Sequence, residues 1–178
     1  RAKGYVISDY FTEDLDKVVV DTTKNFGYLT SDDSPLPVAQ GRNYLIPASE
    51  MAIDYLSKTE KKGFFLMIEG SQIDWGGHAN DSAYIISEMI EFDNTIGKVL
   101  EFAAKDGETL VIITADHETG GYAINPGSTM DSIVPGFTSD YHTATMIPVF
   151  AYGPGAELFG GIYENTAIYD KMKKAFGF

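Results

Sequence analysis

Residues 64–78 read Phe-Phe-Leu-Met-Ile-Glu-Gly-Ser-Gln-Ile-Asp-Trp-Gly-Gly-His. The first five side chains form a continuous apolar run, and Gly63 and Gly70 bound it on either side. Such a run is typical of a strand that is buried on both faces of a sheet. We therefore predict a central strand at Phe64–Ile68, with the polar residues of the quoted stretch lying just beyond its carboxyl end.

The sequence that follows predicts a helix and then a second strand. Apolar residues recur at spacings of three and four from Asp81 to Asp106, with charged residues between them, which indicates a long amphipathic helix. Asp106-Gly107 ends this helix, and Thr109–Thr114 has the composition of a second buried strand. Strand, helix and strand in this order predict a right-handed parallel crossover, and hence an α/β fold with a mainly parallel sheet.

The rest of the chain adds shorter elements to this α/β plan. Pro47 can occupy the first turn of a helix, and a basic residue followed by Gly63 is typical of a helix end. The predicted elements are strands at Tyr5–Ser8, Val18–Val20 and Ile147–Tyr152, loops at Asn25–Asn43 and Gly120–Ser139, and helices at residues 48–61 and 165–176.

Composition bounds the possible functions. The length of 178 residues predicts that residues 1–178 form a single domain or one part of a larger one. The composition, 44% hydrophobic and 22% charged, is typical of a globular protein. The net charge of −13 would repel a phosphate backbone, so a nucleic-acid partner is not expected. There is no cysteine, which excludes disulfides and thiolate metal sites. The apolar runs fall far short of the roughly 20 residues that a membrane-spanning helix needs, so no membrane span is expected.

Acidic and imidazole side chains follow the two clearest predicted strands. Glu69, Asp74 and His78 come after the first strand, and Asp116 and His117 come after the second. In open α/β sheets, polar sites form in the loops beyond the carboxyl ends of the strands, so we expect these two loops to face each other.

The spacing of these residues suits a metal ion. Asp74 and His78 are four residues apart, so one helical turn would aim both at a single ion, although Gly76-Gly77 indicates that the turn is not a plain helix. Asp116 and His117 are adjacent and can serve one ion only after their strand has ended. His142, the third and last histidine, lies ahead of the third predicted strand and could complete the set. In a chain without thiolates, mixed carboxylate and imidazole ligands favour Zn²⁺.

Each of these residues also has a simpler interpretation. A single histidine is more often a surface or hydrogen-bonded core residue than a ligand, and acidic residues are abundant in this chain. Glu118 is equally well explained as a solvated loop carboxylate, and we leave it out of the ligand set. Trp75, the only tryptophan, either packs beside its loop or lines a pocket with its N–H group. Gly76-Gly77 and the other paired glycines are interpreted as turn residues.

Three blocks of sequence resemble a known family. They are E-G-S-Q-I-D-W-G-G-H at residues 69–78, T-A-D-H-E-T-G-G at residues 114–121, and H-T-A-T-M-I-P-V-F-A-Y-G-P-G-A at residues 142–156. In this order they resemble the carboxyl-terminal part of the alkaline phosphatases, which are metal-dependent phosphomonoesterases. The resemblance runs from Gly63 to Ala156, and more loosely from about Gly41. It implies a three-layer αβα fold, incomplete in this chain, with residues 1–178 as the carboxyl-terminal part of the catalytic domain.

The resemblance also implies roles for the residues of the two loops. Asp74, His78 and His142 would hold one zinc, Asp116 and His117 a second, and Glu69 the neighbouring magnesium. In such enzymes a serine attacks phosphorus and the phosphoserine is then hydrolysed, so the substrates would be phosphate monoesters. Export to the periplasm or the cell exterior is implied as well.

Other parts of the family pattern have no counterpart here. The nucleophile belongs to an Asp-Ser-Ala block followed by small residues, and no such block is present. Asp81-Ser82-Ala83 is followed by Tyr-Ile-Ile and opens the long helix. Ser82 is therefore interpreted as a residue of the helix start and not as a nucleophile. The chain begins at Arg1 without a Met or an apolar signal segment, so we expect an excised or processed piece that is inactive alone. A sheet edge exposed in such a piece would favour a homodimer or aggregation.

Two alternative functions stay open at this point. The first is a phosphodiesterase-type member of the same superfamily, which shares the metal ligands but uses a threonine nucleophile or a diester substrate. The second is a non-catalytic module that binds metal and has lost its nucleophile.

Overall fold

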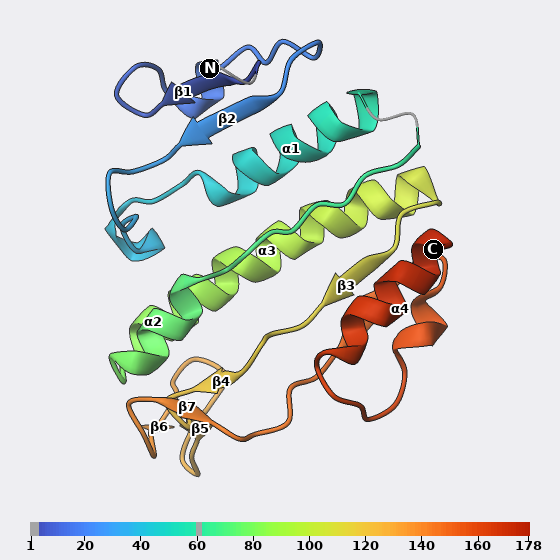
Figure 1. Ribbon diagram of the computed structural model, residues 1–178. Coiled ribbons are helices and arrows are strands. Elements are labelled where there is room, and N and C mark those ends of the chain that lie inside the picture. Colours follow the sequence, from blue (N-terminus) through green and yellow to red (C-terminus); the bar gives the residue numbers. More distant parts are fainter. Residues whose placement is uncertain (1–3, 60–61) are drawn as a thin grey trace. The chain divides into compact units, whose positions relative to one another are not determined.

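The structure is a computed structural model that describes residues 4–59 and 62–178. These residues form two compact units (Figure 1). The first comprises Arg1–Gln72 with Ile86–Lys98, and the second comprises Ile73–Ile85 with Val99–Phe178. Helices and small sheets occur in both, and the α/β class is confirmed by solved structures that share the fold. No helix in the described ranges has the length and apolar character needed to cross a membrane.

The first unit begins with a parallel strand pair beside a helix. Strand β1 (Val6–Asp9) pairs in parallel with β2 (Phe26–Leu29), and helix α1 (Leu45–Thr59) lies alongside them (Figure 1). The short helices η1 (Leu15–Lys17) and η2 (Val38–Gln40) lie in the connections. The predicted strand at Tyr5–Ser8 and the helix after Pro47 are thus confirmed, although the last two residues of the predicted helix lie outside the described ones.

Two predictions for the first unit are wrong. Val18–Val20 forms no strand, because the chain there is leaving η1, and its three β-branched side chains find no partner strand. The predicted loop at Asn25–Asn43 contains β2, whose Phe26 pairs with Val6 of β1. The partner of a strand depends on tertiary structure, which the turn-forming residues of this stretch do not reveal.

The predicted central strand at Phe64–Ile68 is also wrong. This segment forms no ladder with any described residue, and only Phe64, Leu66 and Ile68 are partly buried. Phe65 and Met67 alternate with them and are 60% and 75% exposed. The alternation is that of an extended strand, but a strand also needs a hydrogen-bonded neighbour.

The long helix α3 (Ser82–Asp106) is confirmed, and its ends follow ordinary capping chemistry. The Asp81 side chain accepts hydrogen bonds from the backbone N–H groups of Ala83 and Tyr84, and Gly107 ends the helix in the left-handed conformation. Within the first unit, α3 buries Glu88 and Glu91 against Arg42.

This buried cluster carries one more negative charge than positive charge. The Arg42 guanidinium donates to Glu88 and lies 2.7 Å from Glu91, while Glu88 also accepts from the backbone N–H of Val38 at 2.8 Å. Burial raises the pKa of Glu91; the nearby guanidinium of Arg42 opposes this effect, and the carboxylate of Glu88 adds to it. Arg42 and Glu88 therefore anchor the loop before α1 to α3, whereas Glu91 is the member whose charge is least well compensated.

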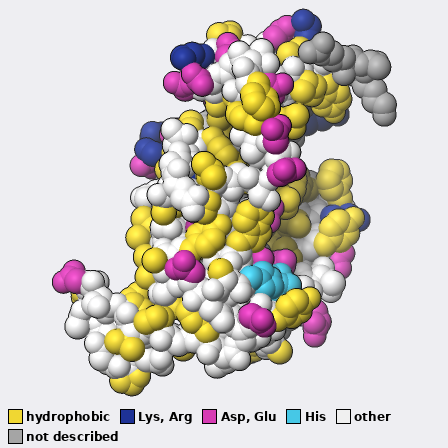
Figure 2. Space-filling view, turned by 90° about the vertical axis from the view of Figure 1, so that its left-hand side faces the viewer, with side chains coloured by type: hydrophobic (Ala, Val, Ile, Leu, Met, Phe, Trp, Pro, Cys, Tyr) yellow, Lys and Arg dark blue, Asp and Glu magenta, His cyan; other side chains and the backbone are white. Residues whose placement is uncertain are grey.

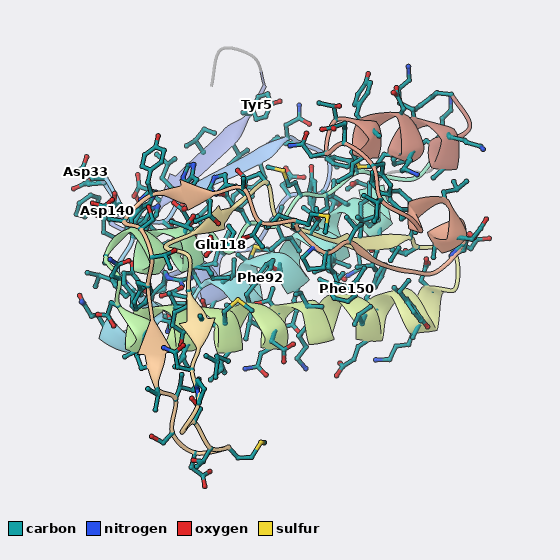
Figure 3. All side chains as sticks on the ribbon, turned by 90° about the horizontal axis from the view of Figure 1, so that it is seen from below. Tyr5, Asp33, Phe92, Glu118, Asp140 and Phe150 are labelled. Carbon is teal, nitrogen blue, oxygen red and sulfur yellow. The ribbon has the colours of Figure 1, made fainter. Side chains whose placement is uncertain are left out.

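The second unit contains three short antiparallel pairs. Strand β3 (Val111–Ile113) pairs with β8 (Phe150–Tyr152), β4 (Glu118–Thr119) with β7 (His142–Thr143), and β5 (Ala123–Ile124) with β6 (Pro135–Gly136). The β5–β6 hairpin projects from this unit (Figure 3). The remaining elements are the short helix η3 (Ala156–Phe159) and helix α4 (Ala167–Phe176). Among the described ladders only β1–β2 is parallel, and β3 pairs with β8 in the antiparallel direction.

Helix α2 (Gln72–His78) corrects the interpretation of Gly76-Gly77 as turn residues. Both glycines lie within the helix, where they allow it to pack closely against its neighbours. A Cβ atom at Gly76 would lie 2.9 Å from the backbone nitrogen of Ile85, and one at Gly77 would lie 2.8 Å from the Cβ and the carbonyl oxygen of Thr119. The absence of side chains thus lets α2 lie directly against the start of α3 and against β4.

We predict that Gly77→Ala destabilises the chain by about 1–3 kcal/mol, because backbone atoms of β4 cannot move aside as a flexible side chain can. The matched control is Gly97→Ala on α3, where an added Cβ would meet nothing within 4 Å. There the higher helix propensity of alanine should stabilise the chain by up to about 1 kcal/mol. Urea unfolding followed by circular dichroism measures both. Equal effects of the two substitutions would contradict the close approach of α2 and β4.

We predict a pH-dependent effect of Glu91→Gln. Because the folded state raises the pKa of Glu91, the stability linked to its neutral form is present at low pH and is lost as the pH rises through the folded pKa. The variant carries no such charge, so its unfolding free energy relative to wild type should increase from pH 4 to pH 7. Urea unfolding at both pH values measures this, with the exposed Glu108→Gln as control. A relative free energy that falls with pH would refute it.

Candidate metal centre

Helix α2 carries the first two predicted site residues. Asp74 and His78 are one helical turn apart and therefore share a face of the helix. The Nε2 atom of His78 lies 3.5 Å from Oδ1 of Asp74. The Nδ1 atom of His78 lies 2.7 Å from the backbone carbonyl of Asp140. Because a carbonyl can only accept a hydrogen bond, this contact requires a proton on Nδ1 and leaves a lone pair on Nε2, the nitrogen that faces Asp74.

The β4–β7 ladder brings the third histidine to the same place. Its register sets His142 opposite Thr119, and the Nε2 atom of His142 lies 3.7 Å from Oδ1 of Asp74. Glu118 holds this small sheet together, since its carboxylate accepts from the backbone N–H groups of Gly121 and Tyr122 and from the hydroxyl of Thr143. Glu118 therefore has a structural role in β4.

Asp74, His78 and His142 form one group that could hold a metal ion. One ligand atom of each lies within 4.8 Å of the other two. A tetrahedral zinc with bonds of about 2.0 Å would set its ligand atoms roughly 3.3 Å apart. The separations of 3.5 Å and 3.7 Å from Asp74 are close to that value, and the ligand nitrogens of His78 and His142 lie within 4.8 Å of each other. The donor set of one carboxylate and two imidazoles therefore fits Zn²⁺ in both chemistry and spacing.

Asp116 and His117 lie next to this group. The Nε2 atom of His117 is 3.2 Å from Oδ2 of Asp116, whereas its Nδ1 atom is 4.0 Å from Oδ1 of Asp74. The rings of His117 and His142 stack with their centroids 3.5 Å apart. Asp74 thus lies within 4.0 Å of a nitrogen of every histidine in the chain.

The cluster is open to solvent. The side chains of Asp74, His78 and His142 are each about one third exposed, and Asp116 is 83% exposed. The histidines form a single patch on the molecular surface, flanked by acidic side chains (Figure 2). Tyr141 borders the patch, because its ring stacks on that of His142 with a centroid distance of 4.6 Å. An ion could therefore reach these groups directly from solvent.

The structure also describes the surroundings of three other residues singled out in the sequence. Glu69 is exposed and belongs to the first unit, whereas the histidine cluster belongs to the second. Trp75 lies on α2 and is 37% exposed. The Ser82 hydroxyl lies 2.8 Å from the hydroxyl of Tyr122, at the first turn of α3. Within the second unit, Ser82 therefore contacts Tyr122 rather than the group formed by Asp74 and its histidines.

Sequence reasoning missed Thr119 and Asp140. Threonine is not a usual metal ligand, and Asp140 contributes through its backbone carbonyl, which no side-chain pattern can reveal. The register of β4 against β7 is what sets Thr119 beside the cluster.

The family model "Alkaline phosphatase" matches residues 42–135 and 130–178 of the chain. Alkaline phosphatase 3 of Bacillus subtilis is 31% identical over 218 residues, covering 80% of this chain and 47% of its own length. The alkaline phosphatase of Escherichia coli K12 is 35% identical over 161 residues, covering 76% and 33%. The chain thus spans half or less of the length of these relatives.

Solved structures agree with this match. The alkaline phosphatase of the Antarctic bacterium TAB5 superposes with a TM-score of 0.84 at 44% identity, covering 99% of this chain and 53% of its own. A mutant of that enzyme with Mg bound in the M3 site gives a TM-score of 0.85 at 42% identity, covering 99% and 54%. On the family match, the fold and the order of its sequence blocks, the chain belongs to the alkaline phosphatase family.

Proposed function

We propose that this chain supplies metal ligands to a phosphomonoesterase that hydrolyses phosphate monoesters with two zinc ions and one magnesium ion. The observation that carries the proposal is the group of Asp74, His78 and His142, whose ligand atoms lie within 4.8 Å of one another. These three residues would hold the first zinc. Family membership supports the reaction class, since the relatives that match are alkaline phosphatases.

The resemblance to the alkaline phosphatases assigns the remaining ligands. Asp116 and His117 would hold the second zinc, because their oxygen and nitrogen atoms lie 3.2 Å apart, close to the roughly 3.3 Å edge of a zinc tetrahedron. Glu69 would bind the magnesium, and Trp75 would line the substrate pocket. When bound, such metal ions stabilise the attacking and leaving oxygens of an in-line phosphoryl transfer.

The chain's own residues prepare the site. The carbonyl of Asp140 holds the proton of His78 on Nδ1, so that Nε2 stays available as a ligand. The carboxylate of Asp74 faces all three imidazoles and would offset part of a metal's charge. Stacking between His117 and His142 fixes the planes of two of the rings. The solvent-exposed side of the cluster leaves room for a phosphate ester to approach.

The serine nucleophile would come from outside residues 1–178. Ser82 is the only serine in an Asp-Ser-Ala triplet, and its hydroxyl is engaged with Tyr122 at the start of α3. We therefore propose that this chain alone does not turn over substrate. By analogy with the family, the whole enzyme would act in the periplasm or outside the cell. A homodimer of this chain would form through a sheet edge left exposed in it.

We predict one tight zinc per chain, because all three residues of the first group are present. His142→Ala should lower the zinc affinity by at least about 100-fold, more than the 10- to 100-fold loss typical of residues that only support a ligand. His117→Ala is the matched control, since it removes an imidazole from the second group and should have a much smaller effect. Isothermal titration with zinc measures both. If the two variants lost zinc equally, or if neither did, the assignment of the first group would be wrong.

We predict no hydrolysis of p-nitrophenyl phosphate by the zinc- and magnesium-loaded chain. The physical reason is that no serine lies in a nucleophile block. Ser82→Ala, measured beside wild type, should bind zinc equally and be equally inactive. Turnover that follows the wild-type protein and disappears in Ser82→Ala would show instead that Ser82 is the nucleophile.

A further inference from the structure

A single hydroxyl contacts both predicted ligand groups. Thr119 lies on β4, opposite His142 in the ladder. Its Oγ1 atom donates a hydrogen bond to Oδ1 of Asp74 and lies 3.2 Å from Nδ1 of His117. Asp74 belongs to the group predicted for the first zinc and His117 to that predicted for the second. No other described side chain is seen to make hydrogen bonds to both groups.

The direction of these hydrogen bonds follows from the donors available. An ionised carboxylate can only accept, so the single hydroxyl proton of Thr119 is directed at Asp74. Toward His117 the Thr119 oxygen can then only accept, which requires the proton of the neutral imidazole to lie on Nδ1. The result is a chain of two hydrogen bonds that runs from His117 through Thr119 to Asp74.

This arrangement decides which nitrogen of His117 can bind a metal. With the proton on Nδ1, the lone pair is on Nε2, the atom that lies 3.2 Å from Oδ2 of Asp116. His78 has the same tautomer, since the carbonyl of Asp140 holds its proton on Nδ1. Two histidines from different elements therefore present the same nitrogen to their carboxylate neighbours.

Packing holds the Thr119 side chain in place. A Cβ built on Gly77 would lie 2.9 Å from the Cγ2 methyl of Thr119, so the methyl occupies the space that this glycine leaves open. A β-branched side chain in a strand also has restricted rotation about its first torsion angle. The hydroxyl is thereby fixed toward the cluster without further hydrogen bonds.

We propose that Thr119 is a positioning residue that orients Asp74 and sets the tautomer of His117, and so couples the two metal-ligand groups. This inference rests on the proposed function, because it assumes that these two groups bind zinc. It assigns to Thr119 no contact with metal or substrate. Residues that support ligands in this way typically contribute 10- to 100-fold to metal affinity.

The test compares zinc binding by wild type, Thr119→Val and Thr119→Ser, using isothermal titration of the metal-free chain with zinc. Valine keeps the shape and removes the hydroxyl, so we expect the affinity to fall about 10-fold or more. Serine keeps the hydroxyl and should restore the affinity to within about 3-fold of wild type. If valine disturbs α2, Thr119→Ala gives the same comparison, because it removes the hydroxyl without a branched side chain beside Gly77.

A second readout follows the tautomer directly. Nitrogen-15 NMR of the metal-free chain at pH 8 should show His117 protonated on Nδ1 in wild type and in Thr119→Ser. Thr119→Val should lose this preference. Thr143→Val is the matched control, since its hydroxyl donates to Glu118 in the same small sheet and not to a predicted ligand. It should leave both the zinc affinity and the His117 tautomer unchanged.

The outcomes separate the two proposals. Zinc binding that is weakened by His142→Ala but unchanged in Thr119→Val would overturn the role of Thr119 and leave the proposed function standing. Zinc binding that is unchanged in both would overturn the proposed function, and the role of Thr119 with it. An effect of Thr143→Val as large as that of Thr119→Val would show general disturbance of the sheet and would also overturn the inference.

Discussion

The candidate metal-ligand cluster depends on the close approach of a helix to a strand. Helix α2 can present Asp74 and His78 to β4 and β7 only because its backbone lies almost in contact with Thr119, and Gly77 has no side chain to prevent this. The hydrogen bond from Thr119 to Asp74 then joins the two elements at the same point. A short helix of seven residues would not be stable alone, so its position must come from such contacts.

The charges of the cluster favour a role in binding a cation over a role in stabilising the fold. Asp74 and Asp116 lie within hydrogen-bonding or ion-pairing distance of imidazoles that are neutral when they bind metal. Partly exposed pairs of this kind contribute little to folding, so their convergence from α2, the segment before β4, and β7 is more economically explained by ligand binding. The buried group around Arg42 differs, because there the polar atoms of Glu88 anchor a loop to α3 and are closed off from solvent.

Local chemistry was predictable where it depends on neighbours along the chain. The periodicity of α3 and its capping by Asp81 and Gly107 could be inferred from sequence, and so could the spacing that brings Asp74 and His78 together. What depends on tertiary partners could not. Phe64–Ile68 has the composition of a buried strand but finds no ladder partner, and β2 was missed because its pairing with β1 is set by the fold. Gly77 was misinterpreted for the same reason, since its role depends on a residue 42 positions later in the sequence.

The most direct test of this account is to locate zinc by anomalous diffraction at the zinc absorption edge, using crystals of the chain grown with one equivalent of zinc. We expect a peak about 2.0–2.2 Å from Oδ1 of Asp74 and from the Nε2 atoms of His78 and His142. A peak bound only by scattered surface carboxylates, with none among these three residues, would contradict it.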